Sequence, residues 1–382
     1  MRKKKKNKRP LIIILSLIII VFGSLYVFKG YFKKDNNLND SGNEDGNIVI
    51  ENIKERNLTF TLAGNVLLNA EMWNDTLSDG KYNFENIFVD LNNIMKKSNI
   101  NFYTQQGILG GSDLGKTVYT DFNTPFEAID ELTKVGFNTI SLASYHANDR
   151  GVQGITNAIN YLNEKKLTYS GISLNEEDRL KNSIIEKNGV KVALLSYTIG
   201  STVVTTNDYS VFIYSEEQVK KDYDAIKDQT DIVIVSIDYS NNKSLDVTDQ
   251  EKTIANYLAN LGVDIVIGNT GYSVQPIEKI NNTLVLYSLG NLLSGHSLTD
   301  NKISAIVDFK FTIKETNDTT EKSIEDINVL LTYVYSLNGS NYRVVPFTKI
   351  QNELNDYKIY YEKYNKLLTE NNNDIKLYSL GE

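Results

Sequence analysis

This 382-residue chain has only two histidines and no cysteine, so few imidazole or thiolate side chains are available for acid–base or metal chemistry. His146 could act as a general acid, since a neutral imidazole titrates near working pH; the alternative is a loop histidine that hydrogen-bonds Asp149 or a backbone carbonyl. Asp238 follows the buried run 232–237 and is the best remaining metal-ligand candidate, or else a helix-capping or loop carboxylate. The catalytic residues are therefore unknown, with His146 and Asp238 as candidates. His296 carries little functional signal.

Two adjacent charged residues, Asp149 and Arg150, also have side chains suited to binding. Together they could clamp a substrate through one carboxylate and one guanidinium group. A local salt bridge that supports the loop explains the same pair. We retain both residues as members of a predicted binding cleft.

The elements that would position these residues alternate between strands and helices. Runs of Val, Ile and Leu at 190–197, 232–237 and 265–268 predict buried strands, with helical spacing of apolar residues between them. This alternation is typical of α/β domains with covered sheets. Ligands of such sheets bind at the carboxyl ends of the strands. We therefore expect the loops after these strands to carry the site.

Two helix starts and a change of pattern complete this prediction. Residues 124–127, Thr-Pro-Phe-Glu, combine an N-cap, a proline at the first helical position and a glutamate at N3; Ser215 opens another helix. From residue 301 the pattern becomes antiparallel, with strands expected at 303–313, 327–335 and 342–349 and a helix at 352–368. We interpret residues 301–382 as a β-rich completion of the same domain with a C-terminal helix.

The N-terminus predicts a membrane anchor. Residues 1–10 are strongly basic, and residues 11–28 form an apolar run that would reach about 27 Å as a helix, close to the ~30 Å hydrocarbon core. The basic segment should stay cytoplasmic, so the prediction is a single-pass plasma-membrane protein with an extracytoplasmic C-terminal domain. A cleaved signal peptide is the alternative, but the run lacks small residues at its end. Residues 29–57 are polar and predict a linker.

Composition narrows the class of partner. The formal net charge is −8, and the seven Lys and Arg of residues 2–9 leave −15 for the rest of the chain. A domain this acidic is a poor electrostatic partner for nucleic acid or for an anionic wall polymer. Without cysteine no disulfide can stabilise it, so it must rely on a large core.

Six short stretches, in order, resemble the CapA family of poly-γ-glutamate capsule synthesis proteins over about residues 58–296. The stretches are at 122–125, 136–138, 146–151, 189–198, 275–278 and 287–291. This resemblance implies a four-layer α/β/β/α sandwich like that of calcineurin-type metallophosphatases, with loops that converge on a metal site. It also agrees with the anchored, outward-facing topology. We assign residues 58–300 to this CapA-like domain.

The positions at which the family binds metal hold other residues in the first half of the domain. The family's Gly-Asp corresponds to residues 64–65, where Asn65 keeps an oxygen but loses the charge. Its Asn-Leu-Glu corresponds to residues 104–106, so the amide of Gln106 replaces a carboxylate. Its Asn-Asn-His corresponds to residues 144–146, which keep His146 but place Tyr145 at the ligand asparagine.

The second half of the domain departs further from the family pattern. The family's His-Trp-Gly is Asp-Tyr-Ser at residues 238–240, and its Gly-His-His-Pro-His is Gly-Asn-Thr-Gly-Tyr at residues 268–272, with Asn269 and no imidazole. These changes lie in loops and spare the strands. Random drift would also have damaged the strands, so the resemblance favours a fold retained for another use.

Two functional hypotheses follow. The first is a membrane-anchored, extracytoplasmic CapA-like protein, metal-free and non-catalytic, that binds a cell-envelope polymer or a partner protein; no cofactor and no nucleic acid are expected. The second is an active hydrolase or amide-bond enzyme in which Asp238, with amide oxygens, holds one weakly bound divalent metal and His146 protonates the leaving group. In both, one cleft should contain a shared set of residues: Asn65, Gln106, Tyr145, His146, Asp149, Arg150, Asp238 and Asn269.

Overall fold

The computed structural model describes residues 53–92, 94–95, 98–203, 209–240 and 245–381. The predicted basic segment 1–10, the predicted anchor 11–28 and most of the predicted linker 29–57 lie outside these residues. Within the described part of the chain, no helix combines the length and apolar character needed to cross a membrane. The described residues have a mixed α/β fold, as the alternation of strands and helices predicts.

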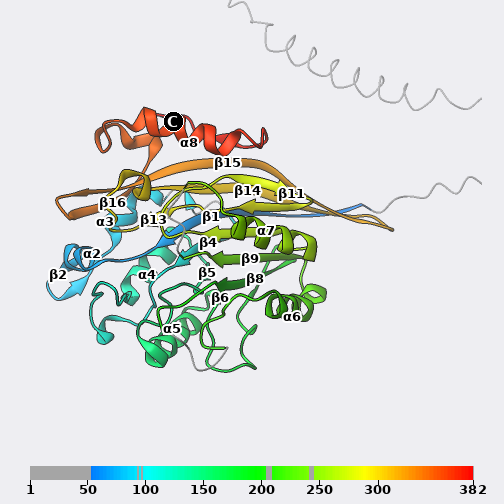
Figure 1. Ribbon diagram of the computed structural model, residues 1–382, viewed down its shortest axis with the longest axis horizontal. Helices are drawn as coiled ribbons and strands as arrows, with labels where there is room; N and C mark the ends of the chain where they lie inside the picture. The colour runs from blue at the N-terminus through cyan, green and yellow to red at the C-terminus, as the bar shows by residue number, and fades with distance from the viewer. Residues whose placement is uncertain (1–52, 93, 96–97, 204–208, 241–244, 382) are drawn as a thin grey trace, which may run out of the picture. The chain divides into compact units, whose positions relative to one another are not determined.

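The larger of two main sheets has nine strands (Figure 1). Its central path runs β16-β15-β14-β1-β4-β5-β6, with β13 beside β1 and β17 beside β15. The four strands from β16 to β1 are antiparallel, and β1, β4, β5 and β6 are parallel. The strands are β1 (Lys54–Val66), β4 (Ile100–Gln105), β5 (Thr139–Ser141), β6 (Thr168–Ser170), β13 (Asn291–Leu293), β14 (Ile303–Glu315), β15 (Thr320–Leu337), β16 (Ser340–Pro346) and β17 (Lys376–Leu377).

The smaller main sheet has six strands in the order β11-β12-β10-β9-β8-β7. Its four inner strands are parallel, and the edge strands are antiparallel to their neighbours. The inner strands carry continuous Val, Ile and Leu because both of their faces are buried. The strands are β7 (Ile184–Lys187), β8 (Val190–Thr198), β9 (Ile232–Asp238), β10 (Ile265–Asn269), β11 (Ile277–Ile280) and β12 (Thr283–Leu286).

One hydrophobic core joins the two sheets, and Phe60 of β1 and Ile234 of β9 are both fully buried in it. Helices cover the other faces: α3 (Glu85–Phe88), α4 (Phe126–Val135) and α5 (Gly151–Lys165) pack on the larger sheet, and α6 (Glu216–Ile226) and α7 (Asp249–Leu261) pack on the smaller. Helix α8 (Tyr357–Thr369) lies on the opposite side of the larger sheet from α4 and α5 (Figure 1). The remaining described α-helix is the short α2 (Ala70–Asp75), and the remaining described strands are β2 (Leu77–Ser78) and β3 (Lys81–Tyr82), which form a hairpin.

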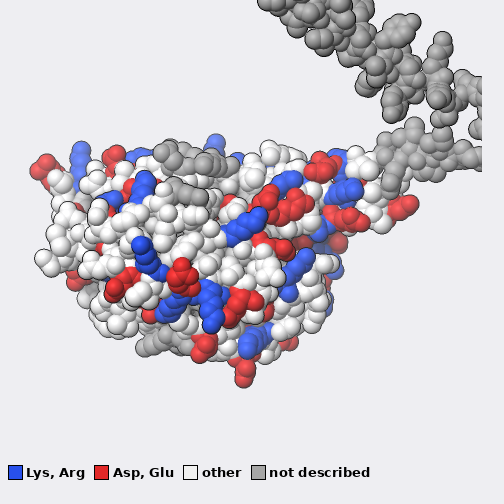
Figure 2. All heavy atoms as spheres, turned by 90° about the horizontal axis from the view of Figure 1, so that it is seen from above, with Lys and Arg blue, Asp and Glu red and all other residues white. Residues whose placement is uncertain are grey.

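The first strand begins earlier than the sequence predicts. Lys54 to Asn57, assigned above to the linker, pair in β1 with Glu315 to Thr312 of β14. Arg56 holds this polar end in place, because its guanidinium forms an ion pair with Asp231 at 2.8 Å and another with Glu315. These residues are polar, so composition alone indicates a linker, whereas the backbone ladder and the ion pairs make them a strand. Figure 2 shows acidic and basic side chains lying close together on the face drawn.

Other element boundaries differ by a few residues. Helix α4 has Pro125 rather than Thr124 as its N-cap, and the Thr124 hydroxyl accepts a hydrogen bond from Gln105 Nε2. Strand β15 starts seven residues before the predicted residue 327, with an exposed first half. Residues 347–352 form a 3-10 helix, so the third predicted strand ends early, at Pro346. Helix α8 follows this segment and begins at Tyr357 rather than at residue 352. Ser215 caps α6 as predicted, since its side chain accepts the Gln218 N–H.

Candidate functional site

The carboxyl ends of strands from both sheets meet at one place. Asn65 near the end of β1 is paired in register with Thr104 of β4 and Asn291 of β13. In the smaller sheet, Asp238 and Asn269 end β9 and β10 and stand opposite each other. A hydrogen bond of 3.0 Å from Thr104 Oγ1 to Asn269 Oδ1 connects the two sheets at this point. The strand ends therefore bring together residues that are far apart in the sequence.

The side-chain amides at these strand ends bond to the protein itself. Asn65 Nδ2 donates to the carbonyl oxygen of Thr270 at 2.7 Å, and Asn65 Oδ1 accepts from Gln106 Nε2 at 3.3 Å. Asn269 accepts from Thr104 as described and donates through Nδ2 to Ser236 Oγ at 3.1 Å. All three amide side chains are buried. The amide oxygens at positions 65 and 269 thus already accept hydrogen bonds.

Asp238 is a buried carboxylate that supports two loops. Its Oδ2 accepts the backbone N–H of Tyr145 at 2.6 Å, and its Oδ1 accepts the backbone N–H of Ser240 at 3.0 Å. Burial raises the pKa of Asp238 above its ordinary value, although the hydrogen bonds from Ser240, Tyr145 and the Gln106 side chain act in the opposite direction. This geometry corresponds to the loop-carboxylate interpretation of Asp238.

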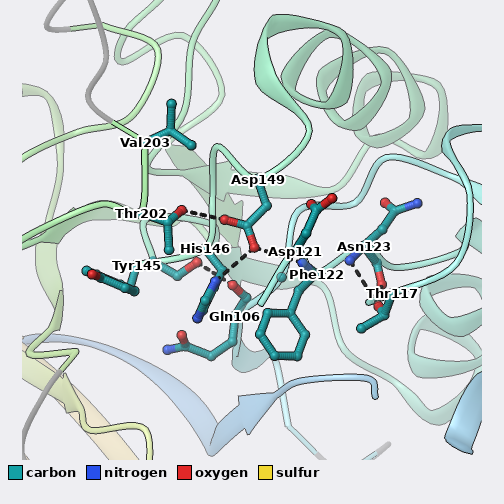
Figure 3. Close-up of polar contacts among 12 residues, drawn as sticks. Gln106, Thr117, Asp121, Phe122, Asn123, Tyr145, His146, Asp149, Thr202 and Val203 are labelled. Carbon is teal, nitrogen blue, oxygen red and sulfur yellow. Dashed lines mark hydrogen bonds and ion pairs between the residues drawn. The ribbon is translucent and has the colours of Figure 1, made fainter. Parts of the chain in front are cut away.

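His146 is held by a carboxylate on the other side of the site. Its Nδ1 lies 2.8 Å from Asp149 Oδ2, and the same oxygen accepts the backbone N–H of Phe122 at 2.8 Å (Figure 3). Thr202 Oγ1 hydrogen-bonds the other carboxylate oxygen. The Asp149 side chain is only 2% exposed, whereas the His146 side chain is 19% exposed. Among the described residues, the His146 ring hydrogen-bonds through Nδ1, to Asp149, and the ring lines the cavity.

Arg150 points to a different partner from its neighbour Asp149. Its guanidinium lies 2.5 Å from Asp121 and donates to the carbonyl oxygen of Lys116 at 2.9 Å. The two predicted clamp residues therefore do not pair with each other: Asp149 fixes His146 and Phe122, and Arg150 fixes the loop at 116–121. This arrangement supports the loop, as in the salt-bridge interpretation, although the ionic partner is Asp121 rather than Asp149.

A cavity of about 420 Å³ lies between these two groups of residues. The predicted residues Gln106, Tyr145 and His146 line it directly. Asn65 and Asp238 lie behind that wall, bonded to Gln106 and to the Tyr145 backbone respectively, and Asn269 lies deeper, among Thr104 and Ser236. The complete lining consists of Leu67, Gln106, Tyr119, Thr120, Phe122, Tyr145, His146, Thr202, Ser240, Gly271, Tyr272, Asn291 and His296.

Sequence reasoning missed His296, which lines the same cavity as His146. Its ring lies 5.2 Å from that of Tyr272 between centroids, and burial lowers its pKa below the ordinary value, although a hydrogen bond with the Gly271 backbone opposes this. Both histidines of the chain therefore face one cavity. The available signal was their scarcity: two histidines in 382 residues justified treating His296 as a candidate despite its distance from the recognised motifs.

Comparison with known proteins gives the lineage of this chain. A profile of the family described as bacterial capsule synthesis protein PGA_cap matches residues 59–296. The PGA biosynthesis protein CapA of Bacillus subtilis strain 168 is 28% identical over 194 residues, which cover 48% of this chain and 49% of that protein. The capsule biosynthesis protein CapA of Bacillus anthracis is 23% identical over 321 residues, or 81% of this chain and 74% of that protein.

The match to the B. subtilis protein spans about half of that relative. The profile match, by contrast, covers more than half of the present chain. It includes the whole smaller sheet, the larger sheet from most of β1 through β13 without β14 to β17, and every residue of the predicted cleft. The chain therefore belongs to the bacterial capsule synthesis protein family PGA_cap.

Proposed function

We propose that this protein is a metal-free, non-catalytic member of its family that binds a cell-envelope polymer or a partner protein during capsule or poly-γ-glutamate synthesis. The binding element is the cavity between Gln106, Tyr145 and His146. Nucleic acid is not among the partners, because the chain beyond the basic N-terminus is strongly acidic.

A single observation carries this proposal: the oxygens at the strand ends are occupied by protein donors. Asp238 accepts two backbone N–H groups, Asn65 accepts from Gln106, and Asn269 accepts from Thr104. A divalent cation needs several free oxygen or nitrogen ligands, preferably charged ones. Neutral amides already engaged in hydrogen bonds are weak ligands. The residues at positions 65, 106 and 269 therefore do not fit the dinuclear metal site that the fold resemblance implies.

The neighbouring side chains do not compensate. Among the described residues, no cluster of three or more His, Cys, Asp or Glu side chains is close enough to hold a metal ion. The nearest carboxylate to His146 is Asp149, which is already bonded to the ring, to a backbone N–H and to Thr202. At the strand ends, Asn65, Asn269 and Asp238 instead hydrogen-bond within the protein, which is how buried polar groups avoid the cost of desolvation.

The architecture and location form part of the same proposal. Two sheets with helices on their outer faces are consistent with a four-layer α/β/β/α metallophosphatase-like sandwich. The basic and apolar segments at the N-terminus support a single-pass plasma-membrane anchor with the domain outside the cell. An extracytoplasmic site would meet envelope polymers directly.

Metal analysis of the full chain tests the proposal. The protein is purified in detergent without chelators, from cells supplied with Mn, Zn and Fe, and its metal content is measured by mass spectrometry. We expect less than about one tenth of an ion per chain, because too few unoccupied ligands remain. Stoichiometric metal that survives gel filtration would overturn the proposal.

A second function is favoured by one observation, the orientation of His146. Asp149 fixes Nδ1, so Nε2 could exchange a proton with a substrate in the cavity, as in an active hydrolase or amide-bond enzyme. Assays with phosphoesters and γ-glutamyl peptides, with His146→Ala beside the wild type, separate the two functions. Turnover that disappears in His146→Ala would establish the enzyme; no turnover in either protein is the result we expect.

A further inference from the structure

We infer that the cavity binds a neutral sugar unit of an envelope glycan, stacked on its aromatic walls. This inference rests on the proposed binding function and names the class of ligand. It starts from the chemistry of the lining, which combines aromatic rings, side-chain amides, hydroxyls and two imidazoles.

Aromatic side chains form much of the wall. Tyr119, Phe122, Tyr145 and Tyr272 all line the cavity. The Phe122 ring packs edge-to-face against His146, with 4.6 Å between centroids, and the Tyr145 ring lies 5.3 Å from His146. A sugar ring presents apolar C–H faces, which pack on aromatic rings, and a rim of hydroxyl groups. The aromatic walls of this cavity can therefore pack against the apolar face of a sugar ring.

Groups suited to hydroxyls lie beside these rings. Thr120 provides a hydroxyl and His146 provides Nε2, whereas the Thr202 hydroxyl and the amides of Gln106 and Asn291 already form hydrogen bonds within the protein and would have to share them with a ligand. Hydroxyls, amides and a neutral imidazole both donate and accept hydrogen bonds, as sugar hydroxyls do. The cavity volume of about 420 Å³ lies within the ~300–1,000 Å³ range of small-molecule pockets. The cavity therefore has the volume to take a single sugar unit beside these groups.

The charge of the cavity lining favours a neutral ligand over an anionic polymer. None of the described residues that line the cavity is Lys, Arg, Asp or Glu. A chain of carboxylates is held by Arg and Lys, which form charge-assisted hydrogen bonds. Burial lowers the pKa of His296, which disfavours the cationic form of this imidazole. The acidic balance of the chain outside the basic N-terminus adds a long-range penalty for a polyanion.

The rim of the cavity carries an exposed aromatic side chain. Tyr119 is 87% exposed and lies 6.3 Å from Phe122 between ring centroids. Its loop is anchored, because Val118 and Asp121 exchange backbone hydrogen bonds and Arg150 bonds to Asp121. The anchored backbone holds Tyr119 at the rim without further ordering of the loop, so its ring can serve as a stacking surface.

Ligand-observed NMR tests the inference on the full chain. The protein is placed in a detergent without sugar head groups, and saturation transfer is measured to a linear N-acetylglucosamine trisaccharide and, separately, to a γ-glutamyl tripeptide. Tyr119→Ala removes the rim ring. Tyr378→Ala is the matched control, because Tyr378 is 40% exposed and is not part of the cavity lining.

We expect saturation transfer to the trisaccharide, affinity about tenfold weaker in Tyr119→Ala, and no change in Tyr378→Ala. A tenfold loss corresponds to about 1.4 kcal/mol. Binding of the γ-glutamyl tripeptide without the trisaccharide, binding of neither, or equal trisaccharide binding by all three proteins would each overturn the inference. These results leave the proposed metal-free function intact, because metal analysis tests that function separately.

Discussion

The two sides of the cavity use polar side chains in opposite ways. On the strand-end side, the amide groups of Asn65 and Asn269 form hydrogen bonds within the protein. On the loop side, Asp149 fixes one nitrogen of His146, whose ring lines the cavity. One side is a closed network that gives rigidity, and the other presents a group to the cavity. The difference separates residues that build the site from residues that could act on a ligand.

Removing the carboxylate at the centre of the loop side should have the largest effect. We expect Asp149→Ala to lower the free energy of unfolding by about 3 kcal/mol, because the buried N–H of Phe122 loses its acceptor. Asp149→Asn keeps one oxygen and should lose about half as much. Urea denaturation of both variants measures this. Equal, small losses below about 0.5 kcal/mol would mean that the loop side does not depend on this carboxylate.

Introducing a charge into the strand-end network should have the next largest effect. In the wild type, the carbonyl oxygen of Thr270 accepts a hydrogen bond from the Asn65 amide. Asn65→Asp places a carboxylate oxygen against that carbonyl oxygen and should cost about 2 kcal/mol of stability. It should not create a metal site, because Gln106 and Asn269 remain neutral amides and residues 268–272 contain no imidazole. Asn282→Asp, at an exposed position, is the control. Calorimetric titration with Mn or Zn decides: binding tighter than ~1 µM, about 8 kcal/mol, would contradict the closed-network description.

The buried carboxylate that joins the two sides predicts a dependence on pH. Burial raises the pKa of Asp238 in the folded state, so the folded protein binds its proton more tightly than the unfolded chain does. This contribution to stability is complete below the unfolded pKa of about 3.9 and is lost as pH rises through the folded pKa. The unfolding free energy of the wild type minus that of Asp238→Asn should therefore fall as pH rises. If the unfolding free energy of the wild type minus that of Asp238→Asn instead rises with pH, the pKa of Asp238 is lowered in the folded state and the prediction is wrong.

The rim should contribute least to stability. Tyr119→Ala should change the free energy of unfolding by no more than about 0.5 kcal/mol, because the side chain is 87% exposed. Phe122 is only 8% exposed, so Phe122→Ala should lower the free energy of unfolding by about 3 kcal/mol. Thermal unfolding monitored by circular dichroism compares the two. Similar losses in both variants would show that Tyr119 is a structural part of the loop rather than a surface presented to a ligand.

Local pattern was enough to predict much of the fold. The runs 232–237 and 265–268 fall within β9 and β10, and Ser215 caps α6, because periodicity and capping depend on residues within one or two turns of each other. The predicted start of β1 was wrong. Lys54 and Arg56 belong to the strand because they pair with β14, and because Arg56 forms an ion pair with Asp231; both partners lie far along the chain. Polar composition cannot distinguish such an arm from a linker.

The site depended still more on distant contacts. The sequence by itself determined the residue types: two imidazoles, amides at positions 65, 106 and 269, and one aspartate at the end of β9. Only the tertiary structure decided that Asp238 accepts the Tyr145 N–H, 93 residues away, and that His296 shares a cavity with His146. The physical reason is that register between strands and packing between sheets set these neighbours, and neither is encoded in the local spacing of residues.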